Sequence, residues 1–264
     1  LAVLAVFTLA TASLYRPWTA RAEMVVSSWA FKLNKNVAAS TKLHHDVSAL
    51  DDSAVQQVVD SAGAQLERTP DIYLIFVESY GSVLYQRDYF KREYAELRRR
   101  IEEQLSTGGW AVRSAMSESP TWGGGSWLSY SSLLMGMRID SHPQYLALFD
   151  RYQIEEYPNL GRTLQQQGYH FAWLSSLDDK YSDAQWAKYR RFIGMDQVVT
   201  FDDLNYVGPT YSWGPAPPDQ FTLNFAVEQA QAETDQPLFF VTITQNSHYP
   251  WAPQPELVDD WRTL

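Results

Sequence analysis

Continuous apolar runs alternate with amphipathic stretches over most of the chain. The runs at 71–77 and 237–244 are short and rich in β-branched and aromatic residues, which predicts buried parallel strands. A similar run at 170–174 predicts a third strand, and 110–115 is also strand-like. Helical spacing predicts helices over 88–105, 126–137, 160–167, 183–192 and 218–232. This alternation predicts an α/β fold with a doubly wound, mostly parallel sheet flanked by helices.

The first residues form an apolar run that ends in Tyr15-Arg16-Pro17-Trp18, an aromatic and basic group typical of a membrane–water boundary. A spanning helix needs about 20 apolar residues, and this run is shorter and starts without Met. We interpret residues 1–15 as the remnant of a transmembrane helix or signal anchor. A cleaved signal peptide and a buried helix are the alternatives. Residues 16–68 are expected to form a helical linker before the main domain, 69–264.

Composition narrows the class of protein. The 264 residues include 21 Lys and Arg against 31 Asp and Glu, a formal charge of −10, which argues against binding to nucleic acid. The absence of cysteine excludes disulfides, thiolate metal sites and a cysteine nucleophile. Aromatic residues make up 14% of the chain, and such a content is typical of surfaces that meet sugars, other ligands or membranes.

Polar residues that could carry chemistry follow the predicted strands, where ligands bind in parallel sheets. Glu78 follows the first strand and could hold a hard cation, although a lone carboxylate there is more often simply exposed. Ser126 follows Gly123-Gly124-Gly125 at a helix start, where the positive helix end favours an alkoxide, but a serine there is also an ordinary N-cap. His248 follows the last strand and could contact an oxyanion or a metal, or be structural.

The order of these features resembles the sulfatase branch of the alkaline phosphatase superfamily. The resemblance covers about residues 71–251 and implies an alkaline phosphatase-like fold. Ser126 lies ten positions before Gly136 in a Leu-Leu-Met-Gly ending, as the family's nucleophile does. A Gly168-Tyr step between helix and strand, and His248-Tyr-Pro after the last strand, also match the family pattern.

Within the superfamily the chain resembles the membrane-anchored lipoteichoic acid synthase or phosphoglycerol transferase-like branch. Glu78-Ser-Tyr-Gly stands where sulfatases have paired aspartates, and Trp127-Leu-Ser-Tyr leaves no formylglycine motif after Ser126. Tyr211-Ser-Trp-Gly followed by Asp219 also resembles this branch. The chain departs from the branch by a serine in place of threonine at Ser126, and by Ser129-Tyr130-Ser131 where the branch has Ser-Glu-Phe.

The resemblance implies a metal-dependent hydrolase or transferase of phosphate or sulfate esters, with Ser126 as nucleophile and a covalent intermediate. One divalent ion (Mn²⁺, Mg²⁺ or Zn²⁺, with Ca²⁺ as a further option) is expected on Glu78, Ser126 and an Asp-His pair. Because no Asp-His pair follows His248, we expect the remaining ligands beyond Leu264 and regard 69–264 as the N-terminal part of a sulfatase-like catalytic domain. The resemblance assigns the substrate to His248, Trp186 and Lys188, although Trp186 also fits a core position.

The expected partners are a phospho- or sulfo-ester, lipid- or glycan-linked, and a membrane reached through the N-terminal helix, with no nucleic acid. The expected location is the inner or cytoplasmic membrane, with the catalytic domain facing the periplasm or the exterior. The alternative hypothesis is a catalytically inactive sulfatase-like protein that binds envelope glycans or lipids through its aromatic residues. The sequence leaves phosphate versus sulfate and hydrolysis versus transfer open.

Overall fold

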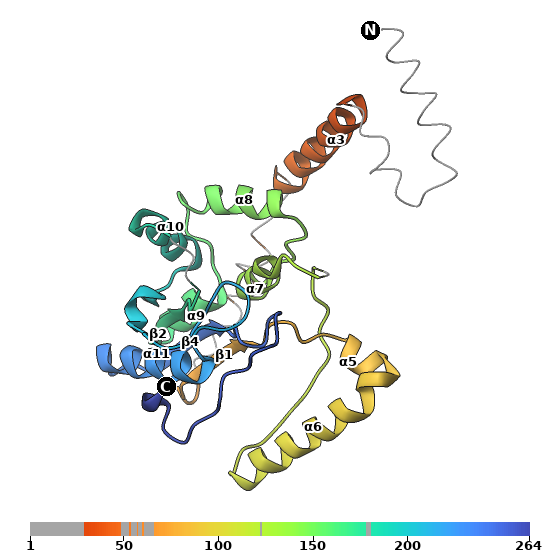
Figure 1. Cartoon of the computed structure of the whole chain (residues 1–264). Helices are drawn as coiled ribbons and strands as arrows, with labels where there is room; N and C mark the ends of the chain where they lie inside the picture. The colour runs from red at the N-terminus through yellow and green to blue at the C-terminus, as the bar shows by residue number, and fades with distance from the viewer. Residues whose placement is uncertain are drawn as a thin grey trace. The chain divides into compact units, whose positions relative to one another are not determined.

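A computed structural model of the chain describes residues 29–48, 53, 57, 60, 66–121, 123–177 and 181–264. These residues form two compact units (Figure 1). The first unit contains helix α3 (Trp29–Ser48) and the start of α8 (His142–Arg151), and the second contains the sheet. The expected membrane-helix remnant at 1–15, and much of the expected linker at 16–68, lie outside the described residues.

Helix α3 is 20 residues long, and most of its described side chains are exposed. Its sequence mixes alanine and serine with lysine and histidine, so it has no long apolar stretch. Among the residues that the structure describes, no helix combines the length and the apolar character needed to cross a membrane.

The second unit is built on a four-stranded sheet in the order β1-β4-β2-β3. Every neighbouring pair of strands is parallel. The strands are β1 (Ile72–Phe76), β2 (His170–Leu174), β3 (Gln197–Val199) and β4 (Leu238–Ile243). This parallel pairing confirms the expected parallel α/β sheet. Parallel neighbours need crossover connections, and the helices between the strands provide them.

Helices cover both faces of the central strands. On one face Phe171 of β2 packs against Phe239 of β4, with ring centroids 4.8 Å apart. Gly161 of helix α9 (Leu160–Gln166) lies so close to Phe171 that an added Cβ would come within 2.3 Å of its ring. The opposite face packs against helix α11 (Asp219–Glu233) through a buried cluster that includes Ala172, Ala226, Ala230 and Phe240. This arrangement is the doubly wound one.

Strand β1 lies at the edge of the sheet and is less covered. It pairs with β4, and its residues alternate between half-buried and exposed. Tyr73 and Ile75 are 45% and 44% exposed, although they are in register with the buried Phe240 and Thr242 of β4. The face that α11 covers at the centre of the sheet is therefore open at β1.

The remaining helices of this unit connect the strands. They are α5 (Val83–Gln86), α6 (Asp88–Thr107), α7 (Ser126–Met135) and α10 (Asp183–Ile193), with 3-10 turns at Asp202–Leu204 and Trp261–Thr263. Helices α5 and α6 pack against each other. A long extended segment links α6 to α7 (Figure 1).

Most predicted elements are confirmed, but one expected strand is absent and several short elements were not expected. The strand expected at 110–115 is wrong: this segment is extended but pairs with no strand in the part of the chain that is described. Trp110 is 70% exposed there, so the run is apolar without being buried. The sequence did not predict β3 or α8, because three residues are too few to show a period and α8 has polar residues among its apolar positions.

Candidate functional site

The carboxyl ends of β1 and β4 are tied together by one threonine. The backbone N–H of Glu78 donates to Thr244 Oγ1 at 3.0 Å, and the backbone N–H of Thr244 donates to the carbonyl of Phe76 at 2.9 Å. Thr244 Oγ1 also lies 2.7 Å from Ser247 Oγ. Glu78 and the segment that leads to His248 are therefore held at the same edge of the sheet, as expected for adjacent parallel strands.

A glycine turn places Ser126 at the start of α7. Gly123, Gly124 and Gly125 have φ values of 60°, 118° and 70°, which side-chain-bearing residues adopt only with strain. Gly125 is the N-cap, so Ser126 is the first helical residue and lies at the positive end of the helix. The three glycines thus determine where the helix begins and in which direction its first side chain points.

The structure brings Ser126 and Glu78 into direct contact. Ser126 Oγ donates to Glu78 Oε1 at 2.7 Å, although the two residues lie 48 positions apart. Both side chains are half-buried. A carboxylate and a hydroxyl oxygen side by side suit a hard divalent cation, which prefers oxygen ligands. Their assigned roles remain predictions, and the described residues contain no group of three His, Cys, Asp or Glu side chains that could hold a metal.

Tyr130 lies beside this pair. Its ring packs against Phe76, with centroids 5.2 Å apart. Burial raises the pKa of Tyr130 to about 12, the negative charge of Glu78 adds to the rise, and the nearby Ser126 side chain opposes it. In the sequence, Tyr130 stood out only as a departure from the motif of the lipoteichoic acid synthase-like branch. Its spacing of four residues from Ser126 on a helix was the available signal, because such residues share a face.

His248 lies in the turn after β4, at the edge that carries Glu78. Its backbone N–H donates to the carbonyl of Gln245 at 3.0 Å, and its Nδ1 lies 2.7 Å from the carbonyl oxygen of Tyr249. Its ring packs against Trp213, with centroids 5.4 Å apart. Within the described part of the chain, none of its hydrogen bonds reaches Ser126 or Glu78. A role of His248 toward substrate remains a prediction.

Asp219 fixes the loop that carries His248. As the first residue of α11, it accepts the backbone N–H groups of Gln245 and Asn246, both at 2.9 Å. Asn246 Oδ1 in turn accepts the backbone N–H of Asp219 at 2.6 Å. Burial raises the pKa of the Asp219 carboxyl, and the two backbone hydrogen bonds oppose the rise. The sequence showed Asp219 only as part of a resemblance, and an acidic residue after Pro218 at a helix start was the further signal.

Trp186 and Lys188 lie on α10, away from these contacts. Trp186 is half-buried among Tyr181 and Tyr189, with centroid distances of 5.5 and 6.0 Å. Lys188 is exposed, and its backbone carbonyl accepts Gln153 Nε2 at 3.1 Å. Among the described residues, no hydrogen bond, ion pair or ring contact joins Trp186 or Lys188 to Ser126 or Glu78. Trp186 is half-buried rather than fully buried, and both its expected substrate role and the alternative of a core position stay predictions.

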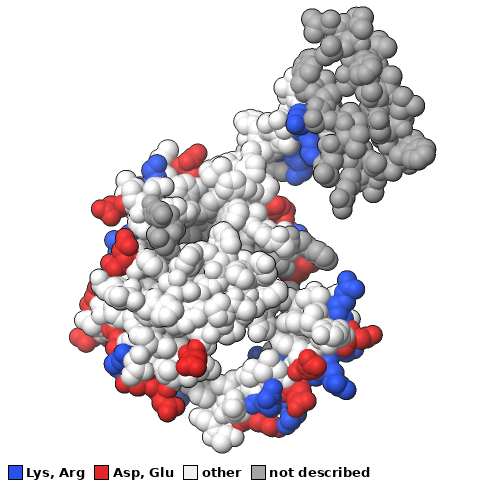
Figure 2. Space-filling view, in the orientation of Figure 1, with Lys and Arg blue, Asp and Glu red and all other residues white. Residues whose placement is uncertain are grey.

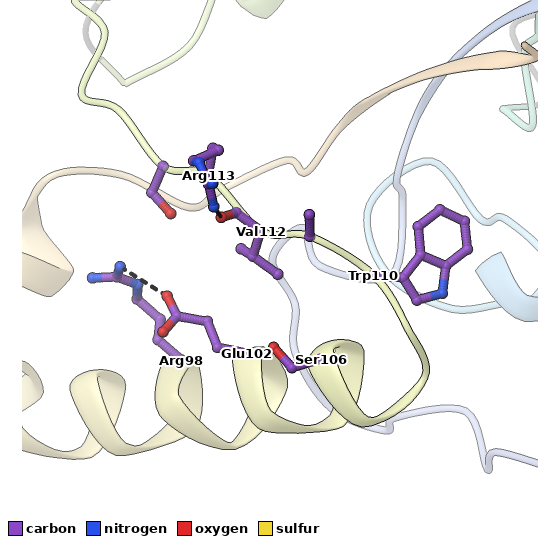
Figure 3. A pocket seen from close by; sticks show the side chains of 8 residues that line it. Arg98, Glu102, Ser106, Trp110, Val112 and Arg113 are labelled. Carbon is purple, nitrogen blue, oxygen red and sulfur yellow. Dashed lines mark hydrogen bonds and ion pairs between the residues drawn. The ribbon is translucent and has the colours of Figure 1, made fainter.

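A hollow of about 460 Å³ lies between α6 and the segment 110–114 (Figure 3). Arg98 and Glu102 form an ion pair at its wall, 3.5 Å apart, and Arg113 donates to the carbonyl of Val112. Trp110 lines it as well. Its lining includes none of the predicted site residues, so it is separate from the Ser126–Glu78 pair.

Comparison with known proteins identifies the family of the chain. The sulfatase family model matches residues 70–260, well over half of the chain, and the chain therefore belongs to the sulfatase family. The expected membership of the sulfatase and alkaline phosphatase superfamily is thereby confirmed. Among curated proteins, none matches the chain.

Two solved structures are similar to the chain. One is the lipoteichoic acid synthase LtaP from Listeria monocytogenes, with 16% identity, a TM-score of 0.49 and coverage of 76% of this chain and 48% of that one. The other is a protein in the alkaline phosphatase superfamily from Vibrio parahaemolyticus, with 14% identity, a TM-score of 0.40 and coverage of 80% and 53%. The chain thus spans about half the length of either structure.

Proposed function

We propose that the protein is a metal-dependent hydrolase or transferase of phosphate or sulfate esters, and that Ser126 is its nucleophile. The observation that carries the proposal is the 2.7 Å hydrogen bond from Ser126 Oγ to Glu78 Oε1. It joins the start of a helix to the end of a parallel strand, at the edge where such sheets bind ligands. Membership of the sulfatase family makes ester chemistry the expected use of this pair.

The metal would be held in part by Glu78 and Ser126, with further ligands from an Asp-His pair outside the described residues. The donor set fits, because both atoms are oxygens and one belongs to a carboxylate. A bound divalent ion would lower the pKa of the Ser126 hydroxyl and neutralise charge on the ester oxygens. Activity measured with Mn²⁺, Mg²⁺, Zn²⁺ or Ca²⁺ will identify the metal.

The residues of the chain would act in two half-reactions. Ser126 Oγ attacks phosphorus or sulfur in line, its new bond forms as the bond to the leaving oxygen breaks, and its proton passes to Glu78. The positive end of α7 favours the charge that develops on Ser126 Oγ. Water or an acceptor hydroxyl then attacks the seryl ester, the bond from phosphorus or sulfur to Ser126 Oγ breaks, and Glu78 returns its proton to restore the Ser126 hydroxyl.

We also propose a cellular location and a class of substrates for this activity. We place the domain that includes residues 69–264 on the outer side of the cytoplasmic membrane, as the resemblance to the membrane-anchored branch implies. Lipid- or glycan-linked esters would then be its substrates, with His248 as a contact to the transferred group. Trp186 and Lys188 are weaker candidates for substrate contacts, because their observed contacts are with their own helix and its neighbours.

The test uses the full-length protein with bis(4-nitrophenyl) phosphate and 4-nitrophenyl sulfate, each with Mn²⁺, Mg²⁺, Zn²⁺ or Ca²⁺ and with EDTA. We expect metal-dependent release of nitrophenol from one of the two esters and a loss of at least about 100-fold in Ser126→Ala. The matched control is Ser129→Ala, one turn along the same helix, because its hydroxyl bonds to Ser119 and Thr121. Full activity in Ser126→Ala would refute the proposal.

A second candidate function is the binding of envelope glycans or lipids without turnover. It is favoured by the exposed aromatic residues Trp213, Tyr249 and Trp251 near the end of β4, which are 60%, 64% and 57% exposed. Figure 2 shows charged side chains mainly at the margins of the viewed face and uncharged residues at its centre. If no ester is hydrolysed but a glycan or lipid quenches tryptophan fluorescence without metal, this candidate replaces the first.

A further inference from the structure

Two loops near the carboxyl end of β4 present large aromatic side chains to solvent. The segment after β4 carries Tyr249 and Trp251, whose rings lie 5.5 Å apart between centroids, edge to face. A turn before α11 carries Trp213, whose ring lies 5.4 Å from that of His248. Because His248 and Tyr249 are consecutive, the three exposed rings belong to one surface. We call Trp213, Tyr249 and Trp251 the aromatic surface.

Hydrogen bonds tie Trp251 to the end of the sheet that carries Glu78. The indole N–H of Trp251 donates to the carbonyl of Ser247 at 2.9 Å. The hydroxyl of Ser247 lies 2.7 Å from Thr244 Oγ1, which accepts the backbone N–H of Glu78 at 3.0 Å. The carboxylate of Glu78 in turn accepts the Ser126 hydroxyl. Trp251 is therefore held near the proposed nucleophile, where it can contact the part of a substrate that lies beyond the reacting ester.

The turn that carries Trp213 is closed on itself. The backbone N–H of Tyr211 donates to the carbonyl of Ala216 at 2.8 Å, and that of Ala216 donates back to Tyr211 at 3.1 Å. Ala216 is fully buried, so the base of the turn is anchored in the protein. Trp213 lies between these two ends and is 60% exposed. A ring that is positioned before a ligand arrives costs little conformational entropy on binding.

The composition of the two loops indicates which ligand suits this surface. Residues 208–218 and 244–255 contain no Asp, Glu, Lys or Arg, so they offer no charged group to an anionic ligand. Their only aliphatic side chains are those of Ala216 and Ala252, so they offer little to an acyl chain. Aromatic faces carry partial negative charge and pack well against the C–H groups of a sugar ring. Amide and hydroxyl groups beside such rings can bond to sugar hydroxyls.

We propose that the aromatic surface binds a neutral sugar ring of the substrate, so that the ester which reacts at Ser126 is attached to a glycan. This assignment rests on the proposed function of Ser126 as nucleophile, and it selects glycan-linked over lipid-linked esters. The sugar stacks on the indole faces while its ester group lies at Ser126 and Glu78. Contacts to this remote part of the substrate position the ester, so their effect is measured in kcat/KM.

The first test compares three phosphodiesters of 4-nitrophenol that differ only in the second alcohol: methanol, glucose joined through its O6, and dodecanol. With full-length protein and metal, we expect kcat/KM for the glucose diester to exceed that for the methyl diester about 5- to 10-fold. Trp251→Ala should remove most of this ratio. The matched control is Trp110→Ala, because Trp110 is 70% exposed and lines the separate hollow beside α6, and it should keep the ratio.

Equal kcat/KM values for the methyl and glucose diesters would overturn the proposal. So would a preference for the dodecyl diester that is lost in Trp251→Ala, because the surface would then be a lipid site. An equal loss of the glucose preference in Trp251→Ala and Trp110→Ala would also count against it, since the effect would not come from the aromatic surface.

A second measurement does not depend on turnover. Saturation-transfer NMR with maltotetraose and with the tetramer of N-acetylglucosamine, on full-length protein in EDTA, reports sugar protons that contact the protein. We expect a signal for at least one sugar that falls at least about fivefold in Trp251→Ala and is kept in Trp110→Ala. No signal, or an equal signal in Trp251→Ala, refutes the sugar surface. If the sugar binds through Trp251 but no ester turns over, the proposed function fails while the sugar surface stands.

Discussion

The hydrogen bonds between Asp219 and the loop after β4 allow a quantitative prediction of stability. Its carboxylate accepts two backbone N–H groups, those of Gln245 and Asn246, and these two residues are only 8% and 7% exposed. Asp219→Ala removes both acceptors and leaves two buried donors without a partner. Each such donor costs about 1–3 kcal/mol.

Part of this loss is offset, because the mutation also removes a carboxylate that burial disfavours, as the raised pKa of Asp219 indicates. We therefore expect Asp219→Ala to lower the free energy of unfolding by about 2–4 kcal/mol. Asp219→Asn keeps one acceptor oxygen and should lose about half as much. Urea unfolding at pH 7, followed by circular dichroism, measures both values.

The control for the Asp219 series is Asp235→Ala, which changes an exposed aspartate beyond the other end of α11, where no hydrogen bond among the described residues joins it to this loop. It should stay within about 0.5 kcal/mol of the unaltered protein. If Asp219→Ala unfolds at the same urea concentration as the control, the two hydrogen bonds contribute nothing net and the reasoning is refuted.

Two further predictions concern pH and packing. The raised pKa of Asp219 means that the folded protein binds this proton more tightly than the unfolded chain does, so the free energy of unfolding should fall as pH rises above the ordinary pKa of 3.8. Asp219→Asn should remove this contribution to the pH dependence of the free energy of unfolding. Unfolding titrations at several pH values measure it, and an unchanged pH dependence in Asp219→Asn would contradict the prediction. Gly161→Ala should destabilise the protein by about 1–3 kcal/mol, because its Cβ would come within 2.3 Å of the Phe171 ring, whereas Gly81→Ala, with open space around it, should be neutral in the same thermal melts.

The fold was predictable where an apolar pattern is regular and ends clearly. The runs that became β1, β2 and β4 are continuous and end at polar residues, and α6, α10 and α11 have enough turns to show helical spacing. The segment 110–115 has the composition of a strand but no neighbour to pair with among the described residues, and pairing is a property of the whole sheet. Composition alone therefore could not separate it from β2.

The site was predictable in part for a similar reason. Glu78 and Ser126 follow regular elements, so the topology of a parallel sheet brings them to one edge. Tyr130 and Asp219 act through contacts across elements, with Phe76 and with the loop at Gln245, and no local pattern encodes such contacts. The sequence could suggest Ser126 and Glu78 as a pair, but not the residues that lie around them.

The open edge at β1 has a consequence for how the protein behaves in solution. Tyr73 and Ile75 are exposed on one face of this strand, as is Val77 just after it, and among the described residues β4 is the one strand that pairs with β1. A strand with free backbone donors and acceptors and apolar side chains is a template on which another strand can add. The sheet can therefore grow at β1, by a segment of the same protein in a productive fold, or by a neighbouring molecule in an aggregate. At high concentration, the tendency of the protein to aggregate will depend on whether its own segment or a neighbouring molecule pairs with β1 first.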